Sequence, residues 1–198
     1  MMFISFVLAY LIGSVSFSYL ITKKIKKVDI RKEGSGNAGA TNTLRVLGVG
    51  PAIGVLILDV LKGVVAILIA QALHLDLWAI ALSGLCAILG HNFPVFFGFK
   101  GGKGVATTIG VFIMLLPIPF VIAGVIGLIL IAITRYVSLG SIILIILTPT
   151  LSLIIGNYSN SITAIGFLIV VLAIWQHRMN IVRLFHGEEN KLGQKKEA

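Results

Sequence analysis

The stretch 51-PAIGVLILDVLKGVVAILIAQAL-73 decides the fold. An α-helix needs about 20 consecutive apolar residues to cross a bilayer, and this stretch is long enough. Pro51 suits the first helical turn, where its missing N–H costs no hydrogen bond. The only charged residues in the stretch are Asp59 and Lys62, which stand one helical turn apart. We therefore expect a transmembrane helix that carries two charges.

Further apolar runs lie on both sides of this stretch. They cover residues 2–21, 77–90, 105–134, 137–155 and 161–176. The run 105–134 is long for one span and holds Pro117 and Pro119, which disrupt a continuous helix. For this run we predict two short antiparallel helices joined at the prolines, with one kinked helix as the alternative. The sequence thus predicts an all-α integral membrane protein with about seven transmembrane helices, two of them short.

The composition is typical of a membrane protein. Of the 198 residues, 58% are hydrophobic and 12% charged, whereas soluble domains carry about 25% charged residues. The length fits a single polytopic membrane domain, residues 1–198, which ends in a polar tail over 187–198, and we expect its residues 188–198 to be loose. The single cysteine, Cys86, can form no intrachain disulfide, and no Cys/His cluster has zinc-like spacing. We expect neither a metal nor another cofactor.

The basic residues are divided unequally between the two ends of the predicted helices. One end receives the loops 23–50 and 91–104, Arg135 and the segment after Gln176, which together hold every Lys and Arg except Lys62. Loops rich in Lys and Arg usually stay in the cytoplasm. This distribution places the N-terminus outside, the C-terminus in the cytoplasm and the large polar loops at the cytoplasmic face.

The formal net charge of +9 does not indicate a nucleic-acid-binding protein. The basic residues are dispersed among loops, with no continuous basic helix and no aromatic RNA-binding motif. Anionic lipid headgroups and phosphorylated substrates explain the charge better. No obligate protein partner is evident from the sequence.

The first polar loop holds the sequence 34-GSGNAGATN-42, followed by Arg45. Glycines let successive backbone N–H groups turn inward around an anion, and the Ser, Asn and Thr side chains add hydrogen-bonding groups. Arg45 supplies a planar fork that suits a phosphate. Thr41 or Asn42 could also cap a short helix over 43–47. A flexible linker is the alternative, but linkers seldom concentrate Asn, Thr and Arg, so we favour an anion site.

The second polar loop holds Gly101-Gly102-Lys103-Gly104, directly before the helix expected from Val105. A glycine loop at a helix N-terminus favours anion binding, and Lys103 adds a mobile positive charge. The order of residues does not match a nucleotide-binding Walker A loop. A loop that anchors to lipid headgroups is the alternative. His91, at the start of the same loop, could bind a ligand or cap a helix end.

The third polar segment begins with His177-Arg178-Met179-Asn180. On a continuing helix, His177 and Asn180 share a face. We expect His177 to orient a phosphate, because an imidazole among so many cations is a weak general base. Glu188 could pair with an arginine and fix the tail.

Three further polar residues lie within the apolar runs. Ser141, near the cytoplasmic end of the run 137–155, could donate into a site there, although a serine in such a place often serves helix packing. Asp59 and Lys62 would be costly in a bilayer if unpaired. They either pair or line a polar cavity, and the sequence leaves both open.

Together the three segments resemble the bacterial membrane acyl-phosphate:glycerol-3-phosphate acyltransferases. The resemblance spans essentially the whole chain, in order. The matching residues are Gly34-Ser35-Gly36-Asn37, Gly39, Thr41-Asn42 and Arg45; Gly90-His91, Pro94 and Gly101-Gly102-Lys103-Gly104-Val105-Ala106-Thr107; and His177-Arg178, Asn180, Arg183, Gly187 and Glu188.

The resemblance implies that an acyl group moves from an acyl phosphate to the 1-hydroxyl of glycerol 3-phosphate, giving lysophosphatidic acid and inorganic phosphate for phospholipid synthesis. It also implies substrate-assisted catalysis, in which the phosphate of the acyl donor accepts the hydroxyl proton, and a location in the bacterial inner membrane with the site facing the cytoplasm. The expected catalytic residues are Ser35, Arg45, Lys103, His177 and Asn180. The expected substrate-binding residues are Gly34, Gly36, Asn37, Thr41, Asn42, Gly101, Gly102, Gly104 and Ser141.

Two other classes fit less well. A small transporter for a phosphorylated metabolite would show inverted repeats and charges near the midplane, and no repeat is visible. A CDP-alcohol phosphotransferase would need clustered Asp residues for its metal, whereas the three Asp of this chain are widely scattered.

Overall fold

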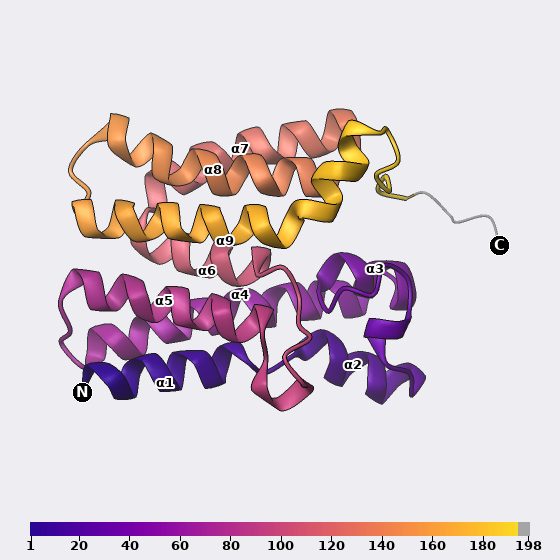
Figure 1. Ribbon diagram of the computed structural model, residues 1–198, viewed down its shortest axis with the longest axis horizontal. Helices are drawn as coiled ribbons and strands as arrows, with labels where there is room; N and C mark the ends of the chain where they lie inside the picture. Colours follow the sequence, from indigo (N-terminus) through magenta and orange to yellow (C-terminus); the bar gives the residue numbers. More distant parts are fainter. Residues whose placement is uncertain (194–198) are drawn as a thin grey trace.

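The computed structural model describes residues 1–193, and these form a bundle of helices without strands (Figure 1). Two short 3₁₀ turns, η1 (Ile30–Lys32) and η2 (Val95–Phe97), lie in the polar loops. The α-helices are α1 (Met2–Gly13), α2 (Phe17–Lys26), α3 (Ala40–Leu47), α4 (Val49–Ala72), α5 (Leu77–Asn92), α6 (Val105–Leu115), α7 (Pro117–Thr134), α8 (Val137–Ile155) and α9 (Asn160–Phe185).

Six helical segments in residues 1–193 are long and apolar enough to cross a membrane. They are α1 with α2 (Met2–Lys26), α4, α5 with η2 (Leu77–Phe97), α7, α8 and α9. The shorter apolar helix α6 is 11 residues long. The all-α membrane architecture expected from the sequence is therefore confirmed.

The run 105–134 forms two helices, as predicted. Helix α6 ends at Leu115, and Pro117 is the first residue of α7, where a proline needs no N–H partner. The two helices run in opposite directions (Figure 1). Only α6 is short, because α7 has 18 residues.

The helices run back and forth so that the long polar loops meet at one end of the bundle (Figure 1). The segments 27–39 and 93–104, the α7–α8 turn and the chain after α9 gather at this end. The N-terminus and the short turns before α5, α7 and α9 lie at the opposite end (Figure 1). The fold thus collects the three polar segments of the sequence in one place.

Small residues allow the helices to pack closely. A Cβ on Gly110 of α6 would lie 2.1 Å from the carbonyl oxygen of Val60 in α4, and one on Gly13 of α1 would lie 2.1 Å from that of Ala87 in α5. Such contacts are common in membrane bundles, where close backbone approach replaces the hydrophobic effect as a source of attraction.

The first turn of α3 differs from the prediction. The helix begins at Ala40 with Gly39 at its N-cap, so the expectation that Thr41 or Asn42 caps a helix over 43–47 is wrong. Asn42 is buried, and its side chain reaches back to the preceding loop. Its Oδ1 accepts from the Ser35 amide at 2.8 Å, and its Nδ2 donates to the carbonyls of Ile30 and Glu33 at 3.2 and 2.9 Å. Asn42 therefore holds the glycine-rich loop in shape.

The chain after α9 is docked up to Gly193, contrary to the expectation of a loose tail. The Leu192 amide donates to the carbonyl of Arg135 at 2.8 Å. The Arg135 guanidinium in turn donates to the Leu192 carbonyl at 2.7 and 3.1 Å. These bonds tie the tail to the α7–α8 turn. The rest of the tail, residues 194–198, lies outside the described residues.

Candidate functional site

A cavity of about 910 Å³ opens among the polar loops. Its walls come from the loops before α3 and α6, from every helix from α3 to α9, and from the chain after α9. Nearly every residue that the sequence predicts for the site lines it: Ser35, Gly36, Asn37, Thr41, Asn42, Arg45, Gly101, Gly102, Lys103, Gly104, Ser141, His177 and Asn180. The fold therefore brings three segments that are distant in sequence into one pocket.

Gly34 is the one predicted site residue that does not line the cavity. It adopts φ +59, which favours glycine, and a Cβ there would lie 2.3 Å from Asn42 Oδ1. The loop can therefore close over Asn42 only with glycine at this position.

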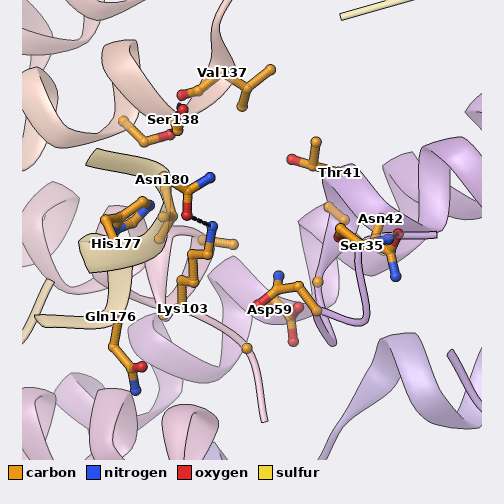
Figure 2. A pocket seen from close by; sticks show the side chains of 18 of the residues that line it. Ser35, Thr41, Asn42, Asp59, Lys103, Val137, Ser138, Gln176, His177 and Asn180 are labelled. Atoms are coloured by element: carbon orange, nitrogen blue, oxygen red, sulfur yellow. Dashed lines mark hydrogen bonds between the residues drawn. The ribbon is translucent and has the colours of Figure 1, made fainter. Parts of the chain in front are cut away.

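A chain of hydrogen bonds crosses one wall of the cavity. Lys103 Nζ donates to Asn180 Oδ1 (Figure 2), and Asn180 Nδ2 donates to Glu189 Oε1 at 2.6 Å. A carboxylate can only accept, so the amide nitrogen of Asn180 must face Glu189. The amide oxygen is then left to face Lys103.

Glu189 is the anchor of this chain, and the sequence-based prediction missed it. Its Oε1 also accepts from Ser138 Oγ at 2.9 Å, and its Oε2 accepts from Arg183 Nε at 2.8 Å. Burial acts to raise the pKa of Glu189, but hydrogen bonds from Arg183, Asn180 and Ser138 outweigh it and lower the pKa below its usual value. The expectation that Glu188 pairs with an arginine is therefore wrong by one residue, since Glu188 is exposed and Glu189 makes the ion pair.

The surroundings of Lys103 destabilise the protonated form of its side chain. The pKa of Lys103 is lowered to about 8, chiefly by burial; the charge of Glu189 opposes this shift, and the nearby charges of Arg183 and Arg45 add to it. A cation held among other cations is stabilised when an anion enters. This wall of the cavity therefore favours a phosphate.

His177 is almost fully buried in α9 and shares a face with Asn180, as the spacing predicted (Figure 2). Its Nδ1 lies 2.8 Å from the Ala173 carbonyl oxygen. A carbonyl oxygen only accepts, so Nδ1 carries a proton and Nε2 is the nitrogen left for a ligand. This fixed orientation suits a residue that positions a substrate group.

The polar side chains of the pocket form two groups. Figure 2 shows Lys103, His177 and Asn180 to one side and Ser35 and Thr41 to the other. The first group comes from the α6 loop and α9, and the second from the loop before α3 and from α3 itself. The pocket therefore offers two sets of polar groups that face a common space.

Apolar residues form another part of the wall, which the sequence-based site prediction also missed. They come from the membrane-spanning helices and include Ile53 and Leu56 of α4, Leu128 and Ile131 of α7 and Leu144 of α8. Ile53, Leu56 and Leu128 are between 41% and 67% exposed, on helices that are long and apolar enough to cross a membrane. The cavity thus has a cationic end and an apolar side that borders the lipid-facing surface.

The two charged residues of α4 form a buried ion pair. Lys62 Nζ lies 2.9 Å from Asp59 Oδ1 and 2.7 Å from His91 Nδ1. Asp59 and His91 also line the cavity. Both alternatives left open by the sequence therefore hold for Asp59, and His91 joins the cluster through its side chain.

Comparison with known proteins gives one family. A family model described as glycerol-3-phosphate acyltransferase matches residues 3–187. The glycerol-3-phosphate acyltransferase of Halalkalibacterium halodurans is 57% identical over 195 residues, which cover 96% of this chain and 95% of that protein. That of a Thermus thermophilus strain is 46% identical over 191 residues, with 96% of this chain and 95% of that protein covered.

Two crystal structures share the fold. One is PlsY (YgiH), an integral membrane glycerol 3-phosphate acyltransferase, in its glycerol 3-phosphate form; it has a TM-score of 0.91 and 41% identity, and covers 97% of this chain and 96% of its own. The other is the lysophosphatidic acid form of PlsY, with a TM-score of 0.88 and 39% identity over 97% of this chain and 95% of its own.

Proposed function

The chain belongs to the glycerol-3-phosphate acyltransferase family, and from that premise we propose that it moves an acyl group from an acyl phosphate to the 1-hydroxyl of glycerol 3-phosphate. As a member of this family it is an integral membrane acyltransferase that acts on glycerol 3-phosphate. The proposed parts are the acyl phosphate as donor, lysophosphatidic acid as product, catalysis assisted by the substrate, and a site on the cytoplasmic side of the membrane.

The observation that carries the proposal is the divided character of the cavity. Its polar end holds Arg45, Lys103 and Arg183, and its apolar side borders the lipid-facing surface. An acyl phosphate has a dianionic head and an apolar chain, so it matches both parts of the cavity. Glycerol 3-phosphate is small and anionic, and fits the polar end.

The reaction needs no nucleophile from the protein, because an acyl phosphate is already activated. The 1-hydroxyl oxygen of glycerol 3-phosphate attacks the carbonyl carbon, and the bond from that carbon to the phosphate oxygen breaks. The hydroxyl proton passes to the departing phosphate, so the products are lysophosphatidic acid and inorganic phosphate. The protein then contributes position and charge stabilisation, which supply much of the acceleration in such reactions.

The two sets of polar groups suggest how the substrates are divided. We assign the acyl phosphate to Ser35, Gly36, Asn37 and Thr41 with the loop Gly101–Gly104. We assign glycerol 3-phosphate to Arg45, Lys103, Ser141, His177 and Asn180. The separation of Ser35 and Thr41 from Lys103, His177 and Asn180 across one pocket supports the division for these five residues, because the attacking hydroxyl must reach the carbonyl from a different direction than the leaving phosphate.

The distribution of charge supports a site on the cytoplasmic side of the bacterial inner membrane. Apart from Lys62, the Lys and Arg residues of the described chain lie at the end of the bundle that holds the cavity (Figure 1). Segments rich in Lys and Arg stay in the cytoplasm. Glycerol 3-phosphate would then enter from the cytoplasm, and lysophosphatidic acid would leave into the inner leaflet.

The test uses the purified protein in detergent with palmitoyl phosphate and glycerol 3-phosphate. We expect equal amounts of inorganic phosphate and lysophosphatidic acid, detected by colorimetry and mass spectrometry, and neither product when glycerol 3-phosphate is omitted. Activity with acyl-CoA but not with palmitoyl phosphate would refute the proposed donor. Unchanged activity in Lys103→Ala or Arg45→Ala would refute the site assignment.

A further inference from the structure

The Asp59–Lys62–His91 cluster lies beside the cavity, and the proposed mechanism makes no use of it. The three side chains are between 1% and 6% exposed. Lys62 Nζ also donates to the carbonyl oxygen of Val15 at 3.1 Å, in the break between α1 and α2. A buried ion pair adds little net stability, because desolvation offsets the attraction between the charges. Its presence here calls for a role other than stability.

The hydrogen bonds of the cluster determine the state of the His91 ring. The Lys62 ammonium has three N–H bonds and no lone pair; it forms an ion pair with Asp59, and its hydrogen bonds go to the Val15 carbonyl and to His91 Nδ1. Nδ1 must therefore accept, which places the ring proton of His91 on Nε2. The ring is held at one edge by Lys62 and presents an N–H at the other.

That other edge of His91 lies against the glycine loop. A Cβ on Gly102 would lie 2.2 Å from His91 Nε2 and 2.5 Å from the Ala38 carbonyl oxygen. The Gly102 amide donates to the His91 carbonyl at 3.1 Å, and a Cβ on Gly101 would lie 2.0 Å from the same carbonyl oxygen. The end of α5, the loop before α6 and the loop before α3 therefore meet at Gly102, which lies directly against the His91 ring.

We propose that the Asp59–Lys62–His91 cluster is a positioning device for acyl transfer, in which Lys62 fixes the His91 ring and the ring sets the spacing between the two glycine-rich loops. The inference rests on the proposed function, because those loops are the segments assigned to the acyl phosphate. His91 acts through the Gly101–Gly104 loop, and Lys62 acts through His91. Neither residue transfers a proton or forms a bond in the reaction.

Two substitutions of His91 separate positioning from mere filling of space. His91→Leu keeps the bulk but removes the acceptor for Lys62, whereas the side-chain oxygen of His91→Gln can still accept from it. A misplacement of about 1 Å costs about a hundredfold in rate, so we expect His91→Leu to lower kcat/KM by about 10- to 100-fold, mostly in kcat. We expect His91→Gln to recover a large part of the loss.

Lys62→Met tests the proposed order of action. If Lys62 acts through His91, the double variant Lys62→Met/His91→Leu should lose no more activity than the worse single variant. Should Lys62→Met fail to fold because Asp59 is left unpaired, the neutral pair Asp59→Asn/Lys62→Met takes its place in the same cycle. Losses that multiply in the double variant would overturn the inference.

Ser83→Ala is the matched control. Ser83 is buried in α5, the helix that carries His91, and its hydroxyl lies 2.9 Å from that of Ser5 in α1, away from the cavity. We expect wild-type kinetics from it, with some loss of thermal stability in detergent. A folded His91→Leu protein within about twofold of wild type would overturn the inference, as would a His91→Gln protein no better than His91→Leu. Each effect is the activity of a variant divided by that of the wild type, measured with the same acyl donor. A wild-type protein that prefers another acyl donor would therefore refute the proposed function, while these ratios would still test the inference.

Discussion

The lowered pKa of Lys103 predicts how the reaction depends on pH. A lysine binds phosphate when it is protonated, and the pKa of Lys103 is lowered to about 8. The favourable charge is therefore present below pH 8 and is lost as the pH rises through that value. From the titration equation, about 90% of Lys103 is charged at pH 7 and about 10% at pH 9.

The measurement is kcat/KM for glycerol 3-phosphate between pH 6.5 and pH 10, because this ratio reports the pKa of the free enzyme. We expect a plateau below about pH 7.5 and a fall that approaches tenfold per pH unit above pH 8.5. The profile of kcat should fall at a higher pH, because a bound phosphate stabilises the charged lysine.

Lys103→Arg is the control for this experiment. A guanidinium stays charged well above pH 10, so the fall near pH 8 should disappear even if the variant is slower overall. Spontaneous hydrolysis of the acyl phosphate is measured without enzyme and subtracted at each pH. A flat wild-type profile up to pH 10, or the same fall in Lys103→Arg, would refute the assignment of this charge to Lys103.

Three further changes test the rest of the structure. Glu189→Gln removes the negative charge and replaces one of the two acceptor oxygens that hold Asn180 and Arg183 with an NH₂ group; we expect kcat/KM to fall by about 5- to 150-fold, for a loss of about 1–3 kcal/mol, and a folded variant with wild-type kinetics would contradict this. Gly110→Ala places a Cβ 2.1 Å from the α4 backbone and should lower thermal stability in detergent, by about 1–3 kcal/mol, whereas Gly124→Ala, with nothing within 4 Å, should not. Leu56→Trp narrows the apolar side of the cavity, so activity over a series of acyl phosphates should shift toward shorter chains; an unchanged profile would count against that side as the acyl site.

Particular sequence features determined the membrane fold because each acts locally. The apolar stretch 51–73 is long enough to cross a bilayer whatever its neighbours are, and Pro117 separates α6 from α7 through its own ring. The segments with Lys103 and His177 could be recognised in the same way, since residue type and spacing alone suggested a phosphate site there.

The tertiary structure decided what the remaining polar residues do. Asn42 looked like a helix cap or a ligand, and the structure shows that both its amide oxygen and its amide nitrogen hold its own loop. Glu189 could be told from Glu188 only once the tail had folded back onto α9 and α8. Lys62 and His91 are distant in sequence, and their contact depends on the packing of α4 against α5. A hydrogen bond between distant segments depends on angles and distances that the fold sets. Local spacing therefore predicts at which end of the helix bundle such polar groups meet, but not which of them form hydrogen bonds with each other.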